Sequence, residues 1–491
     1  MKYPFLFFLS ILLVSCGGSH PDEPKEFNDV PFLPTLYPDY VDVTVPCNIA
    51  PMNFMVTDSA VDAGIARIES NAGVLTVGEG RKVQIPQQEW ERALQSTRDG
   101  SLAVTLYTRV QGEWRRHPSF RIEVAPDEVD PWLSYRLIEP SYVAYEDLDI
   151  MQRNLTCFEE GIIASNHVGK RQEKCINCHS YQNYHTQNML YHVRGAGGGT
   201  RLFYQGQSRL MTALRRDGMM SNPVYPAWHP TLPLIAFSTN LTGQFFHTQS
   251  IAKVEVQDQA SALVLYDVER DTMYQLPHSP ERFDNFPTWS PDGRRLYYTS
   301  ALYVPRDTSV RIDRDMANHY QEVQYNLYYR DFDPARLTFG EEHLLRDLQA
   351  EDQSASLPRV SPDGKSLIYA SGKFGCFHVW HPDADIRLLH LDSLFAGRPD
   401  SLVLDKLLPL NSVRAESYPS WSSNGRWIIF VSRRADGNYS RVYLAYYDAE
   451  GQVHKPFALP QSDPEHDRLL LRSYNRPELM VEGLSPTLPL D

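Results

Sequence analysis

One short pattern recurs four times in the second half of the chain. Its fullest copy begins Pro287-Thr-Trp-Ser-Pro-Asp-Gly293 and continues into an apolar run that ends at Ser300. The anchor positions of the four copies are residues 228, 289, 360 and 421, which are 61, 71 and 61 residues apart. Each copy places a Pro-Asp-Gly type turn beside an apolar strand, and a second strand follows, as in a propeller blade. Because one such unit cannot bury its apolar face alone, the repeats must pack against one another.

The other copies depart from the fullest one at a few positions. The first copy, from Pro226 to Thr239, is degenerate, the third has Val360 in place of tryptophan, and the fourth has Ser423-Asn424 in place of Pro-Asp. These segments resemble the WD40-like (PD40) repeats of the TolB-type β-propeller family over roughly residues 175–480. The resemblance implies a propeller of about five to seven blades that serves as an interaction platform in the cell envelope.

A different pattern precedes the repeats. Short alternating strands are predicted at residues 41–45, 73–77, 102–107 and 120–124, and a helix is predicted over Gln87–Ser96. This pattern is typical of an immunoglobulin-like β-sandwich. Aromatic residues, 12% of the chain, also favour β-structure. We therefore expect an all-β protein with this organisation: signal peptide 1–16, tether 17–39, β-sandwich 40–128, bridging segment 129–174, propeller 175–480 and C-terminal tail 481–491.

The first residues carry the features of an export signal. Lys2 precedes a short apolar stretch that is not long enough to span a bilayer comfortably. The sequence Leu13-Val-Ser-Cys16 resembles a bacterial lipobox, in which Cys16 is lipidated, and the alternative is an ordinary cleaved signal. Gly17-Gly18 does not resemble the aspartate-based signal for inner-membrane retention. The expected location is the bacterial cell envelope, lipid-anchored to the membrane, with the outer membrane favoured over the inner.

Residues 175–179 read Cys-Ile-Asn-Cys-His, the spacing of a covalent attachment site for haem c. The thiols of Cys175 and Cys178 can reach the two vinyl groups of one porphyrin, and the adjacent His179 can bind the iron as the proximal ligand. Three alternatives have weaknesses: a thioredoxin-like dithiol wants a βαβ setting, a zinc site wants further ligands, and a disulfide across so short a loop is strained. The motif therefore predicts one haem c.

The sixth iron ligand must come from elsewhere, or its position stays open. Residues 189–194 alternate like a strand, with Met189, Tyr191 and Val193 on one face and Leu190, His192 and Arg194 on the other. Met189 and His192 therefore cannot both face the iron, and Met189 is slightly favoured. The alternative for Met189 is core packing, and for His192 a hydrogen-bonded side chain. Other candidates are His185, Met211, Met219 and Met220.

Two arginines near the motif are candidates for contacts with the haem propionates. They are Arg194 and Arg201, which flank a glycine-rich segment, residues 195–199, that permits close approach to a flat ring. A solvated arginine is the alternative for each. The order of residues after His179-Ser180 also matches the order after Trp289-Ser290, which places the motif in a first blade with His179 at the tryptophan position.

The remaining cysteines are odd in number. Outside the cytoplasm thiols are normally paired, ligated or lipidated. After Cys16 and the motif are accounted for, Cys47, Cys157 and Cys376 remain, and Cys47 with Cys157 is the disulfide pair to test.

Together these features predict an envelope-anchored monohaem c-type cytochrome, with an electron-transfer or other haem-based redox function and an unknown redox or envelope protein docked on the propeller. The alternative is a TolB-like scaffold that binds a protein or glycan, with the haem structural or absent. A peroxidase-type enzyme would need an open sixth position and a distal acid or base, a role that His185 or His192 could fill. No catalytic residue is assigned. The net charge of −14 and the lack of a basic run argue against a nucleic-acid partner.

Overall fold

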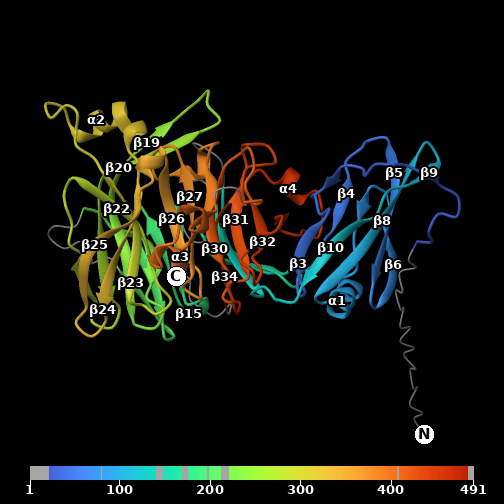
Figure 1. Cartoon of the computed structure of the whole chain (residues 1–491), viewed down its shortest axis with the longest axis horizontal. Coiled ribbons are helices and arrows are strands. Elements are labelled where there is room, and N and C mark those ends of the chain that lie inside the picture. The colour runs from blue at the N-terminus through green and yellow to red at the C-terminus, as the bar shows by residue number, and fades with distance from the viewer. Residues whose placement is uncertain are drawn as a thin grey trace, which may run out of the picture.

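The computed structural model describes residues 21–78, 80–139, 147–167, 175–195, 198–211, 220–405 and 408–484. Strands predominate in these residues, and the helices are short. The all-β prediction is therefore confirmed. None of the helices in the described residues has the length and apolar character needed to cross a membrane. Figure 1 shows the N-terminal strands as a separate layered body beside a larger array of sheets formed by the rest of the chain.

The larger array contains six antiparallel units of four strands each in the described residues. Unit I comprises β14 (Cys175–Gln182), β15 (His185–Arg194), β16 (Gly199–Tyr204) and β17 (Gln207–Met211). Unit II comprises β18 (Pro223–Trp228), β19 (Leu234–Phe246), β20 (Val254–Asp267) and β21 (Thr272–Gln275). Unit III comprises β22 (Arg282–Trp289), β23 (Arg295–Leu302), β24 (Asn326–Asp333) and β25 (Thr338–Arg346). Unit IV comprises β26 (Ser354–Val360), β27 (Ser366–Gly372), β28 (Asp385–His390) and β29 (Leu404–Asp405). Unit V comprises β30 (Glu416–Trp421), β31 (Trp427–Ser432), β32 (Arg441–Tyr446) and β33 (Phe457–Ala458). Unit VI comprises β34 (Ser473–Met480), β11 (Trp132–Ile138), β12 (Leu148–Asn154) and β13 (Glu160–Ser165). One parallel pairing, Ser261 with Phe283, joins units II and III into a single sheet.

The units form a closed ring through their first strands, which are called inner strands below. Each inner strand contacts the inner strand of the next unit, and β34 contacts β14 to complete the circle. Unit VI closes the ring because β34 comes from the end of the chain while β11, β12 and β13 come from residues 132–165. The segment 129–174, expected as a bridge, therefore supplies three strands of this unit. The arrangement is propeller-like.

The inner strands share one local irregularity. In each of them a register shift places two residues opposite a single residue of the neighbouring strand, and the first of the two, called the bulge residue below, has a positive φ. The bulge residues and their φ angles are Cys178 (57°), Tyr225 (51°), Phe286 (50°), Leu357 (54°), Tyr418 (52°) and Arg476 (49°). Such φ values are costly for residues other than glycine, and bulges re-aim side chains. Proline follows the bulge residue in units II to VI, whereas His179 follows it in unit I.

The bulge shows that the predicted alignment of the haem motif with the repeats is wrong by two residues. Tyr181 pairs with Met189 as Trp289 pairs with Leu296, so Tyr181 occupies the tryptophan position. His179 lies two residues earlier, at the position of the repeat proline. The motif nevertheless belongs to the first strand of the first unit.

The N-terminal body contains two sheets. The larger one comprises β1 (Asn28–Asp29), β3 (Val43–Pro46), β5 (Val61–Ser70), β6 (Gly73–Val77), β8 (Gly100–Val110), β9 (Glu113–Arg116) and β10 (Phe120–Ala125); the smaller one comprises β2 (Leu36–Tyr37), β4 (Phe54–Val56) and β7 (Lys82–Val83). The strand prediction is confirmed in all four places. Because β1 and β2 belong to these sheets, the segment 17–39 is packed from Asn28 onward and is not a tether throughout.

Helix α1 (Gln87–Ser96) lies where the sequence predicts it. It buries Trp90, Ala93 and Leu94, spaced so that they share one face of the helix, and Trp90 Nε1 donates a hydrogen bond of 3.0 Å to the carbonyl of Ile49. The other helices are α2 (Ile312–His319), α3 (Leu391–Phe395) and α4 (His466–Leu469), with short 3₁₀ turns at Tyr320–Glu322, Gln349–Glu351, His378–Trp380 and Asp400–Leu402.

The two bodies share a continuous core. Buried residues of the N-terminal sheets and of units V and VI form one hydrophobic cluster. Polar contacts add to it: Tyr40 donates a hydrogen bond of 3.2 Å to the carbonyl of Ala458, and Asn53 donates one of 3.1 Å to that of Gln461. The N-terminal body is therefore fixed against the side of the ring.

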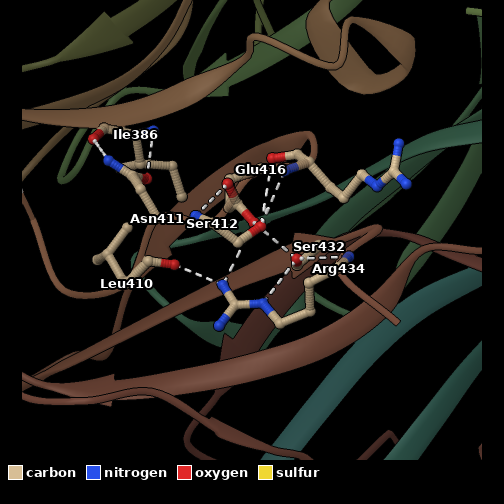
Figure 2. A network of polar contacts seen from close by, with 8 residues as sticks. Ile386, Leu410, Asn411, Ser412, Glu416, Ser432 and Arg434 are labelled. Atoms are coloured by element: carbon tan, nitrogen blue, oxygen red, sulfur yellow. Dashed lines mark hydrogen bonds and ion pairs between the residues drawn. The ribbon is translucent and has the colours of Figure 1, made fainter. Parts of the chain in front are cut away.

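A buried carboxylate lies at the centre of a polar network near the junction of units IV and V (Figure 2). Glu416 at the start of β30 is fully buried, and its Oε1 accepts hydrogen bonds from the hydroxyls of Ser412 (2.6 Å) and Ser432 (2.7 Å). Arg434 lies 3.3 Å from the same oxygen, and the neighbouring Asn411 bonds the backbone of β28. Burial raises the pKa of Glu416 above its ordinary value.

Replacing Glu416 with alanine is expected to lower the free energy of unfolding by about 2 to 3 kcal/mol, because it leaves the Arg434 guanidinium and two serine hydroxyls without their acceptor. Denaturant titration measures the change. Glu113→Ala, in the exposed part of β9, is the matched control and should alter the free energy by less than about 0.5 kcal/mol. Equal effects of the two substitutions would contradict the role assigned to this network.

Candidate functional site

A cavity of about 170 Å³, open to solvent on one side, lies where the inner strands of units I, II, V and VI meet. All three functional side chains of the predicted haem motif line it: Cys175, Cys178 and His179. The hairpin of β19 and β20 completes its wall together with Phe377, Val379 and Trp380.

The bulge in β14 brings the two thiols to the same cavity. In a regular strand, residues three positions apart point to opposite faces, so Cys175 and Cys178 would diverge. The register shift after Asn177 and the left-handed backbone at Cys178, with φ of 57°, change the direction of the second thiol. Neither thiol is in a disulfide. Asn177 Nδ2 lies 3.3 Å from Cys175 Sγ, which helps to hold the first thiol in place.

His179 is fully buried beside the thiols. Both ring nitrogens are shielded from solvent and make no hydrogen bond of good geometry within the described residues. Burial, together with the positive charges of Arg476 and Arg136, holds the pKa of His179 well below its ordinary value, although the backbone of Arg476 acts in the opposite direction. A neutral buried imidazole with unsatisfied nitrogens is costly unless another group uses them. A metal ligand role would satisfy one of them.

The cavity wall carries an excess of positive charge. Four arginines line it, Arg136, Arg194, Arg433 and Arg476, whereas Glu139 is the one acidic residue among the described lining residues. The guanidinium of Arg433 lies 3.4 Å from the ring centroid of Trp380, and burial lowers the pKa of Arg433 to about 9. Arginines in this setting favour a carboxylate-bearing ligand.

The structure places neither predicted sixth ligand at the cavity. The alternation predicted for β15 is confirmed, since Met189, Tyr191 and Val193 share one buried cluster and Leu190 belongs to another. Met189 is 1% exposed within that cluster, where it packs as a core residue. His192 lies on the opposite face, and its Nδ1 is 3.1 Å from the hydroxyl of Thr200. Burial lowers the pKa of His192 to about 4.

The other residues that the sequence suggested for the haem site also lie partly at the cavity and partly elsewhere. Arg194 lines the cavity, but Arg201 lies in β16 opposite Tyr191 and does not. His185 is more than half exposed and pairs with Glu482 at 3.1 Å. Met211 packs in the core between units I and II, and Met220 does not line the cavity. Cys16 and Met219 lie outside the described residues.

The remaining cysteines form no disulfide in the described part of the chain. The suggested pair, Cys47 and Cys157, is not bonded. Cys47 is buried 3.9 Å from the carbonyl of Pro126, and Cys376 is buried 3.8 Å from a carboxylate oxygen of Asp258.

Sequence reasoning did not find several cavity residues. Tyr225 and Tyr418 are the bulge residues of units II and V, and both line the cavity. Their shared signal is present in the sequence, because each directly precedes the proline of its repeat. Burial raises the pKa of both tyrosines, so they are neutral phenols. Arg136 and Arg433 carry no comparable signal.

Comparisons with known proteins do not assign a family. No protein-family description and no curated protein matches the chain. Among solved structures, a luciferin-regenerating enzyme is similar with a TM-score of 0.36 and 10% identity, over 66% of this chain and 90% of that chain. An oligogalacturonate lyase in complex with manganese has a TM-score of 0.29 and 12% identity, over 73% and 86%. The tricorn protease has a TM-score of 0.35 and 11% identity, over 74% and 34%. At such scores the likeness carries no functional argument.

Proposed function

We propose that this protein is an envelope-anchored monohaem c-type cytochrome built on a TolB-like six-bladed β-propeller, with an immunoglobulin-like β-sandwich at its N-terminus. One observation carries the proposal: Cys175, Cys178 and His179 line a single cavity. The spacing of the motif is that of haem c attachment, and the bulge turns both thiols to the same side.

In this proposal the chain's own residues have separate tasks. Cys175 and Cys178 hold the porphyrin through thioether bonds, and His179 supplies the proximal nitrogen. Arg194, already suggested by the sequence, and Arg136 offer positive charge for the propionates. Bound haem c supplies one-electron redox chemistry.

The alternatives for the motif have less support in the geometry. Among the described residues, the one group of three His, Cys, Asp or Glu side chains close enough to share a metal ion is Asp147, Asp149 and His167, and none of these lines the cavity. A zinc site at Cys175 and Cys178 would therefore lack ligands. A TolB-like scaffold that binds a protein or glycan without haem is the second candidate, and the experiment below separates it from the first.

We also propose the cellular setting from the N-terminal sequence. Lipidation of Cys16 would attach the protein to a membrane of the bacterial envelope, with the outer membrane favoured. A single haem cannot transfer electrons over a long distance alone, so electron transfer requires a redox partner, an envelope protein docked on the propeller.

A pyridine haemochrome spectrum tests the proposal. The protein is produced in a bacterial strain with a c-type cytochrome maturation system and denatured before extraction with acidified acetone. The expected result is one c-type haem per chain that stays with the polypeptide. A folded, colourless protein would exclude the cytochrome and leave the scaffold that binds a protein or glycan.

A further inference from the structure

The hairpin of β19 and β20 extends beyond the ring. β19 has 13 residues and β20 has 14, whereas the corresponding strands of unit V, β31 and β32, have six each. Figure 1 shows the ends of β19 and β20 projecting from the array of sheets. This part of the hairpin, residues 242–257, is called the strap below. Thr242, Gln244, Val254 and Val256 belong to the strap and line the cavity, so the strap forms one wall of it.

The tip of the strap reaches the opposite side of the ring. In a closed ring of six units, units II and V are three steps apart in either direction, so they face each other. Ile251, in the turn between β19 and β20, lies against the loop after β31 of unit V, because a methyl group placed on Gly437 would be 2.8 Å from Cδ1 of Ile251. The strap therefore connects two units whose inner strands meet at the cavity.

A buried pair fixes the middle of the strap to the segment after β27. Glu255 and His381 are both buried, and Oε2 of the glutamate lies 2.5 Å from Nε2 of the histidine. This pair is called the latch below. Val254, the neighbour of Glu255 in the strap, packs with Val379 and Trp380 in one small apolar cluster. The latch and the cluster together hold the strap against the ring.

The seat of the strap leaves polar atoms unsatisfied. Oε1 of Glu255, Oε1 of Gln257 and Nδ1 of His381 are buried and have no hydrogen-bond partner among the described residues. Such atoms are costly to bury, and water would satisfy them if the strap lifted. This cost offsets part of what the latch and the apolar cluster contribute. The free-energy difference between a seated and a lifted strap is therefore small, as a two-state element requires.

The base of the strap combines an anchor with a bend. Asp258 accepts hydrogen bonds from Asn285 (2.8 Å) and Tyr325 (2.7 Å), so the chain is held firmly where the strap begins. The pairing of β19 with β20 shifts register between Leu241 and Thr242. A bulge of this kind bends a pair of strands. The strap can therefore move as a unit while its base stays in place.

We propose that the strap is a gate: it lifts about the bulge at its base, separates Glu255 from His381, and so controls access to the cavity that Cys175, Cys178 and His179 line. The gate is a property of the folded chain and does not depend on bound haem. It goes beyond the proposed function, because it determines when a small molecule from solvent can reach the motif.

The rate at which N-ethylmaleimide modifies the thiols tests the gate. The full chain is produced without a c-type maturation system, which leaves the thiols free, and mass mapping of peptides separates Cys175 and Cys178 from Cys47. Cys47 is 1% exposed in the core shared with the N-terminal body, so its modification reports global unfolding. Each rate is measured at several urea concentrations below the unfolding transition, because global unfolding depends steeply on urea and a local opening does not.

Glu255→Ala is expected to speed the modification of Cys175 and Cys178 about tenfold or more, because losing a hydrogen bond to a charged group shifts the seated state by at least about one decade. The two rates should depend only weakly on urea, in contrast to the rate at Cys47. Glu341→Ala, at an exposed position of β25, is the matched control and should leave the rates unchanged.

Two results would overturn the gate. Equal rates in the wild-type protein and in Glu255→Ala would show that the thiols are reached without movement of the strap. Faster modification with the urea dependence of Cys47 would show that only global unfolding exposes them. Both results leave the haemochrome assay unaffected, so failure of the gate is distinguishable from failure of the cytochrome.

A milder substitution at the tip keeps the test decisive if Glu255→Ala does not fold. Ile251 is 38% exposed, so Ile251→Ser removes the contact with unit V without opening the core. It is expected to speed the modification of Cys175 and Cys178. Ile162→Ser, at a 55% exposed position of β13, is its control and should not change the rates. Equal rates in these two variants would refute the gate.

Discussion

Replacing Cys175 and Cys178 together with alanine is expected to remove all covalent haem. In the proposed cytochrome the two thioether bonds are the attachment, so haem that remains after acidified-acetone extraction should fall from one equivalent to none. The fold should persist, since both side chains line a cavity and neither forms a disulfide. The haemochrome assay measures the loss, and far-ultraviolet circular dichroism checks the β-structure.

The chain itself provides the matched control for this experiment. Cys47 and Cys157 are two further cysteines outside the cavity, and both are unpaired. The variant Cys47→Ala/Cys157→Ala should retain one haem per chain. Haem retained in the Cys175/Cys178 variant, or lost equally in both, would show that attachment does not depend on the motif.

Replacing Tyr474 with alanine is expected to lower the free energy of unfolding by about 3 to 5 kcal/mol, the usual cost of removing a large buried aromatic side chain. Tyr474 is 2% exposed in the closing strand β34, and its ring centroid lies 4.9 Å from that of Tyr135 in β11. Its hydroxyl also lies 3.3 Å from a carboxylate oxygen of Asp467. The substitution therefore weakens the strand pair that closes the ring.

Denaturant titration with circular dichroism measures this effect. Tyr274→Ala removes the same side chain from β21, where the tyrosine is 36% exposed, and should change the free energy by less than about 0.5 kcal/mol. If Tyr474→Ala proved no more costly than Tyr274→Ala, the closing strand would not be coupled to the core as its burial indicates.

Local patterns in the sequence predicted the local elements well. The repeats identified the strands of units II to V, and the spacing of apolar residues located α1 at Gln87–Ser96. Unit VI was missed because its strands come from residues 132–165 and 473–480, and no local pattern connects segments more than 300 residues apart. Pairing between such distant strands depends on how the ring closes, and the spacing of apolar residues along the sequence carries no information about ring closure.

The site was predicted in part for a related reason. Strict alternation correctly separated Met189 from His192, but it does not tell which face of a strand meets a cavity. No pattern in the sequence predicted the bulge at Cys178, so the predicted alignment of His179 with the repeats was wrong by two residues. Arg136 reaches the cavity only through the closing unit, so its place depends on the same long-range pairing.

The position of β34 has a consequence for how the protein is made. The strand that completes the circle begins at residue 473, so it is synthesised long after Cys175. If the chain is exported and carries haem as proposed, the thiols emerge before the ring can close, and an enzyme that attaches haem can reach them while the chain is still extended. Once β34 is in place, His179 is sealed from solvent. In the proposed cytochrome, haem attachment would therefore come first and ring closure afterwards.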